Sequence, residues 1–234
     1  MSIVEAISVE YIDHMGNDIR VANVARTSFN KWNNEDEPIS DRDNNLLDYL
    51  ATGLPASERY DWVARSNASK HWSPFAHCFL SVRCAAPIFL ARQLVKHQVG
   101  LSWNEESRRY ITEEVKLWLP CSVSEKPTNA KQGAGQVHTS SEEIRQMMYS
   151  MTDQAVHNYN LLLDMGVAPE EARAVLPLNA VTHWVWSGSL MAFARVVHQR
   201  KDGHAQTAAR EFAACLEDIL REHFPQSTAA LLDR

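Results

Sequence analysis

The feature that most restricts the fold is the segment 87–110, where a helix with one core-forming face leads directly into a dense polar stretch. Pro87 suits the first turn of a helix predicted to run to about Gln98. Its apolar face is formed by Leu90, Ala91, Leu94 and Val95. A second, polar face is formed by Arg92, Gln93, Lys96 and His97, since residues three and four apart are helical neighbours. The fold must therefore bury one face of this helix and leave the other beside a polar region.

Residues 92–110 combine four cationic side chains, a histidine, two carboxylates, two serines and three amides. Such groups gain little from burial and cost free energy when unpaired, so the density favours a site for an anionic, hydrogen-bonding ligand. Arg109 with Ser107 can form a phosphate clamp, because the guanidinium is a planar fork of donors. Glu105 and Gln93 can form hydrogen bonds with sugar hydroxyls and with the edge of a base. The donors that suit a second ligand are Lys96, His97 and Gln98.

Composition narrows the classes of function. The formal net charge of -6 argues against a protein that mainly grips nucleic acid, and an RNA- or DNA-binding role rests only on Arg92, Lys96, Arg108 and Arg109. The first residues lack the pattern of a secretory signal, and no apolar run approaches the roughly 20 residues of a membrane span. We expect a cytoplasmic protein without membrane contact. The four cysteines lack metal-ligand spacing, so free thiols are expected and no metal site is indicated.

Hydrophobic periodicity and turn residues divide the chain into strands and helices without a separating linker. Strands are predicted at residues 3–12, 75–85, 108–118 and 179–187. Helices are predicted at 18–29, from 46 to Gly53, at 87–98, 141–165, 190–201 and 204–222, with a short one beginning at Pro169. Polar loops are expected at 30–43 and 121–140, and Met147 and Met151 are expected in the core. One α+β domain over residues 1–234 is the simplest account.

Three further clusters contain groups capable of chemistry: residues 71–77 with His71 and His77, residues 173–177 with Arg173, and residues 195–206 with Arg195 and Arg200. Taken singly, each histidine is more often structural than a ligand, and each arginine is more often a surface charge. Their significance depends on their being brought together.

The four clusters, in this order, resemble the flavin-dependent thymidylate synthases. The family motif is an Arg-His-Arg triplet followed by Ser-x-Asn-Glu-x-Ser-x-Arg-Tyr, which corresponds here to Lys96-His97-Gln98 and to residues 102–110 with a spacer one residue longer. Matching flanks occur at residues 91–93, 71–77, 172–177 and 204–206. The resemblance spans roughly residues 17–224 and is specific in its central motif.

The resemblance implies roles for individual residues. The dUMP site would comprise Gln93, Lys96, Glu105, Glu106, Ser107, Arg108, Arg109, Arg173 and Arg200, with Ser107 and Arg109 on the phosphate. The FAD site would comprise Ser73, Lys96, His97, Gln98, Ser189 and Arg195. Arg200, four residues before His204, would lie against the uracil as the catalytic residue and favour ionisation of N3.

The implied chemistry is reductive methylation of dUMP to dTMP. Methylenetetrahydrofolate would supply the carbon, NADPH would reduce FAD, and tetrahydrofolate would be released. No cysteine nucleophile is needed. The implied fold is a mostly antiparallel sheet flanked by helices, intertwined in a homotetramer whose subunits share each site.

The chain departs from the family pattern in ways that motivate an alternative. Lys96 and Gln98 replace arginines, so bidentate contacts there are lost, and Ala76 and Ala208 stand where the family has glutamates. These changes raise the alternative of a catalytically impaired regulatory protein that keeps the dUMP pocket.

Overall fold

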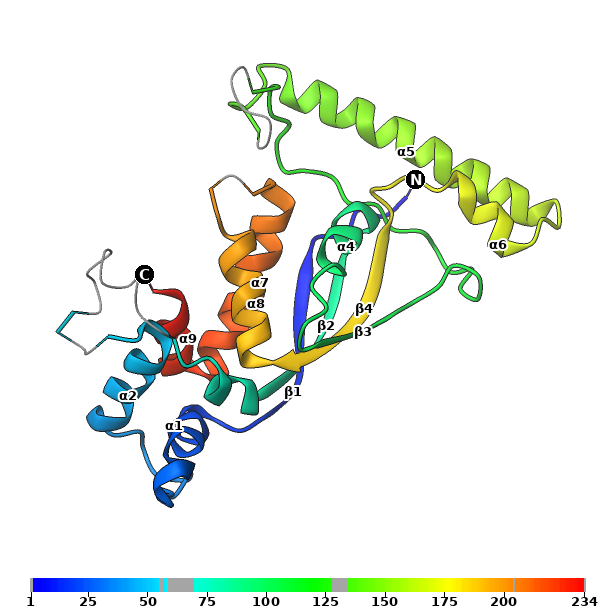
Figure 1. Ribbon diagram of the computed structural model, residues 1–234. Helices are drawn as coiled ribbons and strands as arrows, with labels where there is room; N and C mark the ends of the chain where they lie inside the picture. The colour runs from blue at the N-terminus through cyan, green and yellow to red at the C-terminus, as the bar shows by residue number, and fades with distance from the viewer. Residues whose placement is uncertain (1, 55–56, 59–69, 128–133, 204, 234) are drawn as a thin grey trace.

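The computed structural model describes residues 2–54, 57–58, 70–127, 134–203 and 205–233, and is organised around a four-stranded antiparallel sheet (Figure 1). The strands are β1 (Ser8–Met15), β2 (Phe79–Pro87), β3 (Leu101–Glu105) and β4 (Val181–Ser189), in the order β1-β2-β4-β3. The expectation of an α+β fold with an antiparallel sheet is confirmed.

Alternation along β2 and β4 assigns the two faces of the sheet. Leu80, Val82 and Cys84 of β2 are buried, whereas Phe79 and Arg83 are exposed. The buried face of β4 carries Trp184 and Trp186, which pair in register with Cys84 and Val82. One face of the sheet therefore supplies the floor of the main core.

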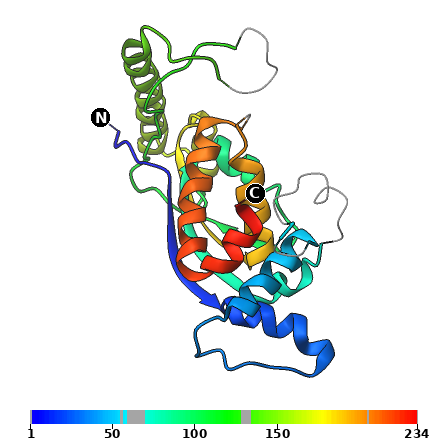
Figure 2. The same ribbon diagram turned by 90° about the vertical axis from the view of Figure 1, so that its left-hand side faces the viewer.

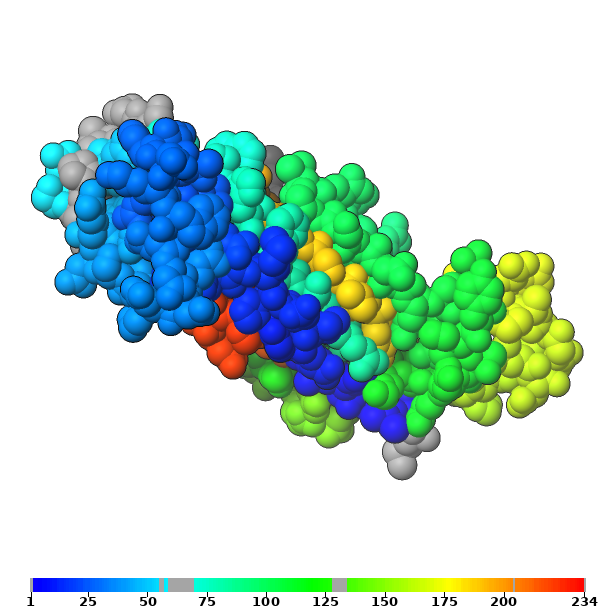
Figure 3. Space-filling view, turned by 90° about the horizontal axis from the view of Figure 1, so that it is seen from below, coloured from blue at the N-terminus to red at the C-terminus, as the bar shows by residue number. Residues whose placement is uncertain are grey.

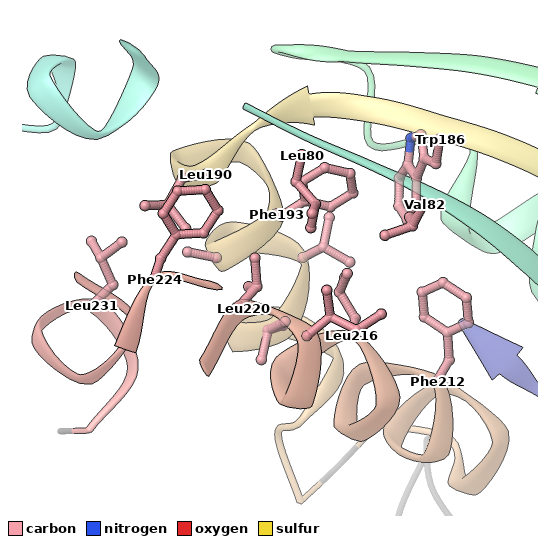
Figure 4. Packing of buried hydrophobic residues seen from close by; sticks show 14 of the residues in the cluster. Leu80, Val82, Trp186, Leu190, Phe193, Phe212, Leu216, Leu220, Phe224 and Leu231 are labelled. Carbon is pink, nitrogen blue, oxygen red and sulfur yellow. The ribbon is translucent and has the colours of Figure 1, made fainter. Parts of the chain in front are cut away.

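Three C-terminal helices cover this face: α7 (Leu190–Arg200), α8 (Thr207–His223) and α9 (Pro225–Leu232). Figure 4 shows their side chains meeting those of the sheet, with Phe212 and Leu216 of α8 below Val82 and Trp186, Phe193 of α7 beside Leu80, and Phe224 near Leu190 and Leu231. Figure 2 shows α7, α8 and α9 together in front of the strands. On the opposite face, residues of β1, β2 and β4 lie side by side at the surface (Figure 3).

An N-terminal helical layer is fixed to the end of this core. Asn17 caps α1 (Asp18–Arg26), which continues as the 3₁₀ turn η1 (Thr27–Phe29), and Ser40 caps α2 (Asp41–Thr52). Gly53 ends α2 with φ 75°, as predicted for a glycine C-cap. Buried Asp18 accepts hydrogen bonds from the backbone N–H groups of Gln226 and Ser227, each at 2.9 Å, so α1 holds the start of α9.

A long helix, α5 (Ser141–Asp164), lies at the opposite end with α6 (Pro169–Ala172) and the 3₁₀ turn η3 (Arg173–Val175) (Figure 1). A second, smaller core forms there from Val115, Leu117, Val156, Tyr159, Ala172 and Ala180. The prediction that Met147 and Met151 are core residues is wrong, because they are 61% and 68% exposed. The α5 helix buries only one narrow stripe, and its methionines lie outside that stripe.

Other boundaries differ from the sequence predictions for identifiable reasons. The predicted strand 108–118 is wrong: β3 lies earlier, inside the polar segment, where Leu101 and Trp103 alternate with Ser102 and Asn104. Leu117 instead forms isolated bridges to Val4 and Ala180. The strand predicted at 75–85 begins only at Phe79, after the 3₁₀ turn η2 (Ser73–His77).

The helices were predicted more closely. Helix α4 (Ile88–Leu94) is shorter than 87–98, and α8 begins at Thr207, while His204 lies outside the described residues. Helix α9 was not predicted. The loop 121–140 holds one isolated bridge, Ser124 to Val137, in its described part. Among the described residues, no helix is long and apolar enough to cross a membrane.

Candidate functional site

The contact between Arg200 and His97 joins two of the sequence clusters. Arg200 is the last residue of α7, and His97 follows α4, 103 positions earlier. The guanidinium donates to His97 Nε2 from Nε at 3.1 Å and from a terminal nitrogen at 2.8 Å. Burial and the charge of Arg200 lower the pKa of His97, and burial lowers the pKa of Arg200. The imidazole is thus a neutral acceptor that orients the guanidinium.

Strand β3 orients Glu105 through both of its carboxylate oxygens. Oε1 accepts from the Thr182 hydroxyl at 2.8 Å, and Oε2 accepts from the Trp103 indole N–H at 3.0 Å. Trp103 in turn stacks on Trp184 with ring centroids 4.3 Å apart. The exposed carboxylate is therefore held by the sheet instead of rotating freely.

Glu106 pairs with His183 on the next register position of β4. Its Oε2 lies 3.1 Å from His183 Nδ1, and its backbone N–H donates to the carbonyl oxygen of His183 at 3.0 Å. Burial alone would raise the pKa of Glu106, but the hydrogen bond and charge of His183 bring it below its ordinary value. The side chain of Glu106 is consequently an anchor for the segment that follows.

That segment is a tight turn carrying Ser107 and Arg109. The backbone N–H of Tyr110 donates to the Ser107 carbonyl at 2.9 Å, and Arg109 Nε donates to Ser107 Oγ at 3.2 Å. The Arg109 guanidinium also lies 4.9 Å from the centre of the Tyr110 ring. Arg108 donates to the backbone carbonyls of Glu113 and Glu114 and so braces the loop. The predicted clamp residues, Ser107 and Arg109, are adjacent and exposed or half-buried.

The polar face of α4 carries the next group of predicted site residues. Gln93 Oε1 is buried and has no hydrogen-bond partner among the described residues, which is unusual for a buried amide and leaves an acceptor open to a further donor. Lys96 and Gln98 are exposed. The extended polar face predicted from the sequence is therefore present, although regular helix stops at Leu94.

A cavity of about 310 Å³ lies between η2, α2 and α7. Trp72, Phe75 and Met191 line it, and Arg195 stands at its edge with its guanidinium 5.6 Å from the centre of the Trp72 ring. Ser73 follows Trp72 and is exposed. An aromatic wall with a cationic edge suits a planar aromatic ligand that also carries negative charge.

Ser189 and Arg173 lie outside the groups of contacts described above. Ser189 is buried, and its hydroxyl accepts the backbone N–H of Ala192 at 3.2 Å, which makes it the N-cap of α7. Arg173 is exposed beside α5 and donates to the Glu170 carbonyl at 3.2 Å. In Figure 1, α6, which precedes η3, lies to the right of the sheet and α7 to its left.

Sequence reasoning assigned no role to Thr182, His183 or Trp72. Thr182 and His183 could be identified only from the pairing of β3 with β4, in which Glu105 is opposite Trp184. Neighbouring residues of β4 then fall beside the two glutamates. This register is not visible without knowing that residues 101–105 form a strand.

The structure is an α+β fold in which a polar turn with Ser107 and Arg109, an aromatic cavity and an arginine–histidine pair are positioned by different elements. The sequence matches the family described as thymidylate synthase complementing protein over residues 10–226. The chain therefore belongs to this family, the flavin-dependent thymidylate synthases, as the sequence resemblance predicted.

Individual relatives are similar along nearly the whole chain. Flavin-dependent thymidylate synthase from Thermosipho africanus is 30% identical over 94% of this chain and 89% of its own. The protein of the same name from Thermotoga neapolitana is 30% identical over 96% of this chain and 90% of its own. The crystal structure of the UMP/dUMP methylase PolB from Streptomyces cacaoi bound with 5-Br dUMP has the same fold, with a TM-score of 0.77 at 24% identity over 98% of this chain and 96% of its own.

Proposed function

We propose that this protein catalyses the FAD-dependent reductive methylation of dUMP to dTMP. Methylenetetrahydrofolate donates the carbon, NADPH is the reductant, and tetrahydrofolate is released. The observation that carries the proposal is the Arg200–His97 contact, which connects a nucleotide-side residue to a flavin-side residue across 103 positions of sequence. Family membership and the name shared by the relatives support it.

The nucleotide side is assigned to the turn and the surrounding polar groups. Ser107 and Arg109 bind the phosphate, because they present a hydroxyl, backbone N–H groups and a guanidinium at one exposed turn. The buried, unpartnered Gln93 Oε1 supports a donor from the nucleotide at that position. The remaining residues assigned to dUMP are Lys96, Glu105, Glu106, Arg108, Arg173 and Arg200.

The residues assigned to FAD fit an aromatic, anionic cofactor. Trp72 and Arg195 form one edge of the apolar cavity, beside Ser73. His97 and its exposed neighbours Lys96 and Gln98 extend the polar surface, and Ser189 fixes the start of the helix that carries Arg195. The flavin supplies redox chemistry that the protein side chains lack, whereas the protein supplies orientation and electrostatics.

Arg200 is assigned the catalytic role. Its guanidinium is partly desolvated and is held by a neutral histidine, so its charge remains available to a ligand that develops negative charge. Placed against uracil, it stabilises the N3-ionised ring and increases electron density at the carbon to be methylated.

The same proposal includes the assembly. One domain, residues 1–234, forms a cytoplasmic homotetramer in which Arg173 reaches the nucleotide of a neighbouring subunit. Arg173 follows a residue of the smaller core, whereas Arg200 ends a helix of the main core, and this division supports the arrangement together with the exposed methionines of α5.

Purified protein provides the test. We expect a yellow protein that NADPH bleaches and that is reoxidised on adding dUMP with methylenetetrahydrofolate, with tritium released from [5-³H]dUMP. A protein that takes up no FAD and releases no tritium contradicts the proposal.

A second candidate is a regulatory protein that binds dUMP without turnover. Lys96 and Gln98 in place of arginines favour it, as does Ala208, which is buried in the main core where a carboxylate would be costly. Separate titrations discriminate: dUMP binding without reoxidation of reduced flavin by dUMP and folate supports the regulatory role.

A further inference from the structure

His183 lies between two carboxylates and outside every motif that the family resemblance assigns. Its Nδ1 lies 3.1 Å from Glu106 Oε2, and its Nε2 lies 3.4 Å from both carboxylate oxygens of Glu5. The side chains of all three residues are about four-fifths buried, with exposed fractions of 22%, 21% and 23%. A ring with a carboxylate at each nitrogen is a double donor, which is the charged form of histidine.

On one side, His183 holds the residue that begins the phosphate-binding turn. Glu106 directly follows β3 and is attached to His183 twice, through its side chain and through the backbone hydrogen bond at 3.0 Å. The next residue, Ser107, starts the turn. Any movement of Glu106 therefore shifts Ser107 and Arg109 together.

On the other side, His183 contacts the point where the same loop returns to the sheet. Glu5 accepts from Lys116 Nζ at 3.1 Å, and its backbone N–H donates to the Leu117 carbonyl at 2.9 Å. The loop 107–115 thus leaves at Glu106 and comes back beside Glu5. The histidine bridges its two ends.

We infer that His183 is a positioning residue for the nucleotide phosphate, which in its charged form ties Glu106 to Glu5 and thereby keeps Ser107 and Arg109 in their binding geometry. The inference rests on the proposed function, because it takes the turn to be the dUMP phosphate site. It adds a residue from β4 and one from the N-terminal segment to the determinants of dUMP affinity.

The electrostatic surroundings of His183 favour the charged form at neutral pH. The hydrogen bond to Glu106 raises the pKa of His183, burial opposes this, and the charges of Glu106 and Glu5 add to the increase. The groups that face or border the ring are Glu106 after β3, Glu5 in the N-terminal segment, Lys116 in the returning loop, Glu10 of β1, and Arg83 and Cys84 of β2, with Arg108 acting on Glu106.

The bridge formed by charged His183 should weaken as pH rises. Because the pKa is raised above the ordinary value of about 6.5, the bridge is fully formed below that pH and is lost as pH rises through the raised pKa. The second pKa of the dUMP phosphate is about 6, so the charge of the phosphate changes little between pH 7 and 9. Deoxyuridine carries the same uracil ring and therefore controls for ionisation of N3.

The experiment measures the Kd of the flavin-loaded protein for dUMP and for deoxyuridine, which lacks the phosphate, from pH 7 to 9. We expect His183→Gln to raise the Kd for dUMP roughly tenfold at pH 7 and to leave deoxyuridine unchanged. Wild-type affinity for dUMP should fall between pH 7 and 9, whereas His183→Gln should show a flat profile. His183→Lys should retain most affinity with a flat profile, because lysine stays charged to about pH 10.4. The control is His157→Gln, on the exposed side of α5.

Glu5→Gln leaves the Glu106–His183 hydrogen bond in place and should raise the Kd for dUMP by a smaller factor than His183→Gln does. This variant provides a second test if the His183 variants fold poorly. Unchanged dUMP affinity in all the variants at His183 and Glu5, or equal losses for dUMP and deoxyuridine, would overturn the inference while dUMP still binds the wild type. A wild-type protein that binds no dUMP refutes the proposed function itself, and the inference with it.

Discussion

Arg200 is the side chain on which the proposed chemistry depends most. Two of its N–H groups are directed to His97, which leaves the outer part of the guanidinium to a ligand. Its orientation thus depends on the protonation state of one histidine.

Replacing Arg200 should separate catalysis from binding. Arg200→Ala is expected to keep the fold and the flavin but to lower the turnover of dUMP by roughly 10²- to 10³-fold, because the charge that stabilises the ionised ring is lost. Arg200→Lys keeps a positive charge without the planar guanidinium, so its turnover should lie between that of the wild type and that of Arg200→Ala. Single-turnover dTMP formation and the visible spectrum provide the measurement. Near wild-type turnover in Arg200→Ala would show that the arginine has no activating role.

The His97 imidazole should resist protonation. Its pKa lies below 6.5, so its contribution to stability is present above 6.5 and is lost as pH falls toward the lowered value, where the unfolded chain takes up the proton first. We expect an NMR titration to find His97 still mostly neutral near pH 6.5, the ordinary midpoint of a free histidine. In Arg200→Ala the pKa of His97 should rise, and an unchanged value would contradict the electrostatic coupling.

Arg109 should contribute to affinity more than to turnover. Arg109→Ala removes the guanidinium from the turn and is expected to raise the Kd for dUMP at least tenfold, through the loss of a charge-assisted contact to phosphate. Arg92→Ala, an exposed arginine of α4, is the matched control. Titration calorimetry measures the Kd for dUMP in each variant. If Arg109→Ala binds dUMP as tightly as Arg92→Ala does, Arg109 does not bind the phosphate.

Among the secondary-structure elements, β3 decides how the polar segment is displayed. It lies so close to β4 that a Cβ on Gly188 would be 2.3 Å from the Gly100 carbonyl oxygen and 2.6 Å from Leu101 Cδ2. Glycine is required there because another backbone passes, and not because of its φ angle.

Gly188→Ala should therefore displace β3. We expect a loss of about 1–3 kcal/mol in the free energy of unfolding together with weaker dUMP binding, since Glu105 and the following turn move with the strand. Gly203→Ala is the control, because a Cβ there meets no atom of the described part of the chain within 4 Å. Denaturant unfolding and dUMP titration measure both effects. A stable Gly188→Ala protein with normal affinity would show that the strand can shift without affecting the turn.

Across the entire chain, the two cores are at different ends, and the proposed nucleotide residues are divided between them. The main core positions Arg200, whereas the smaller core positions Arg173. Under the proposed assembly, complete sites form between neighbouring subunits.

Mixing two impaired variants, assayed at a dUMP concentration well below saturation, tests this arrangement. Arg173→Ala and Arg109→Ala, unfolded together and refolded, should regain about one quarter of the wild-type activity per site if the two side chains come from different subunits of a mixed oligomer, as random pairing dictates. Each variant refolded alone should stay impaired. Light scattering is expected to give four copies. A monomer, or mixtures no more active than the separate variants, would contradict shared sites.

Local features of the sequence predicted the helices well. The periodicity in 18–29, 141–165 and 190–201 and the glycine at 53 depend on residues a few positions apart, so they could be identified without knowing the fold. The family motif likewise assigned the polar segment to a nucleotide and a flavin, because its spacing is local.

The contacts that make the site coherent depend on the tertiary structure. The strand at 101–105 is short and largely polar, and its pairing with β4 creates the Glu105–Thr182 and Glu106–His183 contacts across 77 positions. The Arg200–His97 contact spans 103 positions. Such pairs arise from strand register and helix packing, which involve the whole chain at once, whereas propensity, capping and motif spacing act over one or two turns.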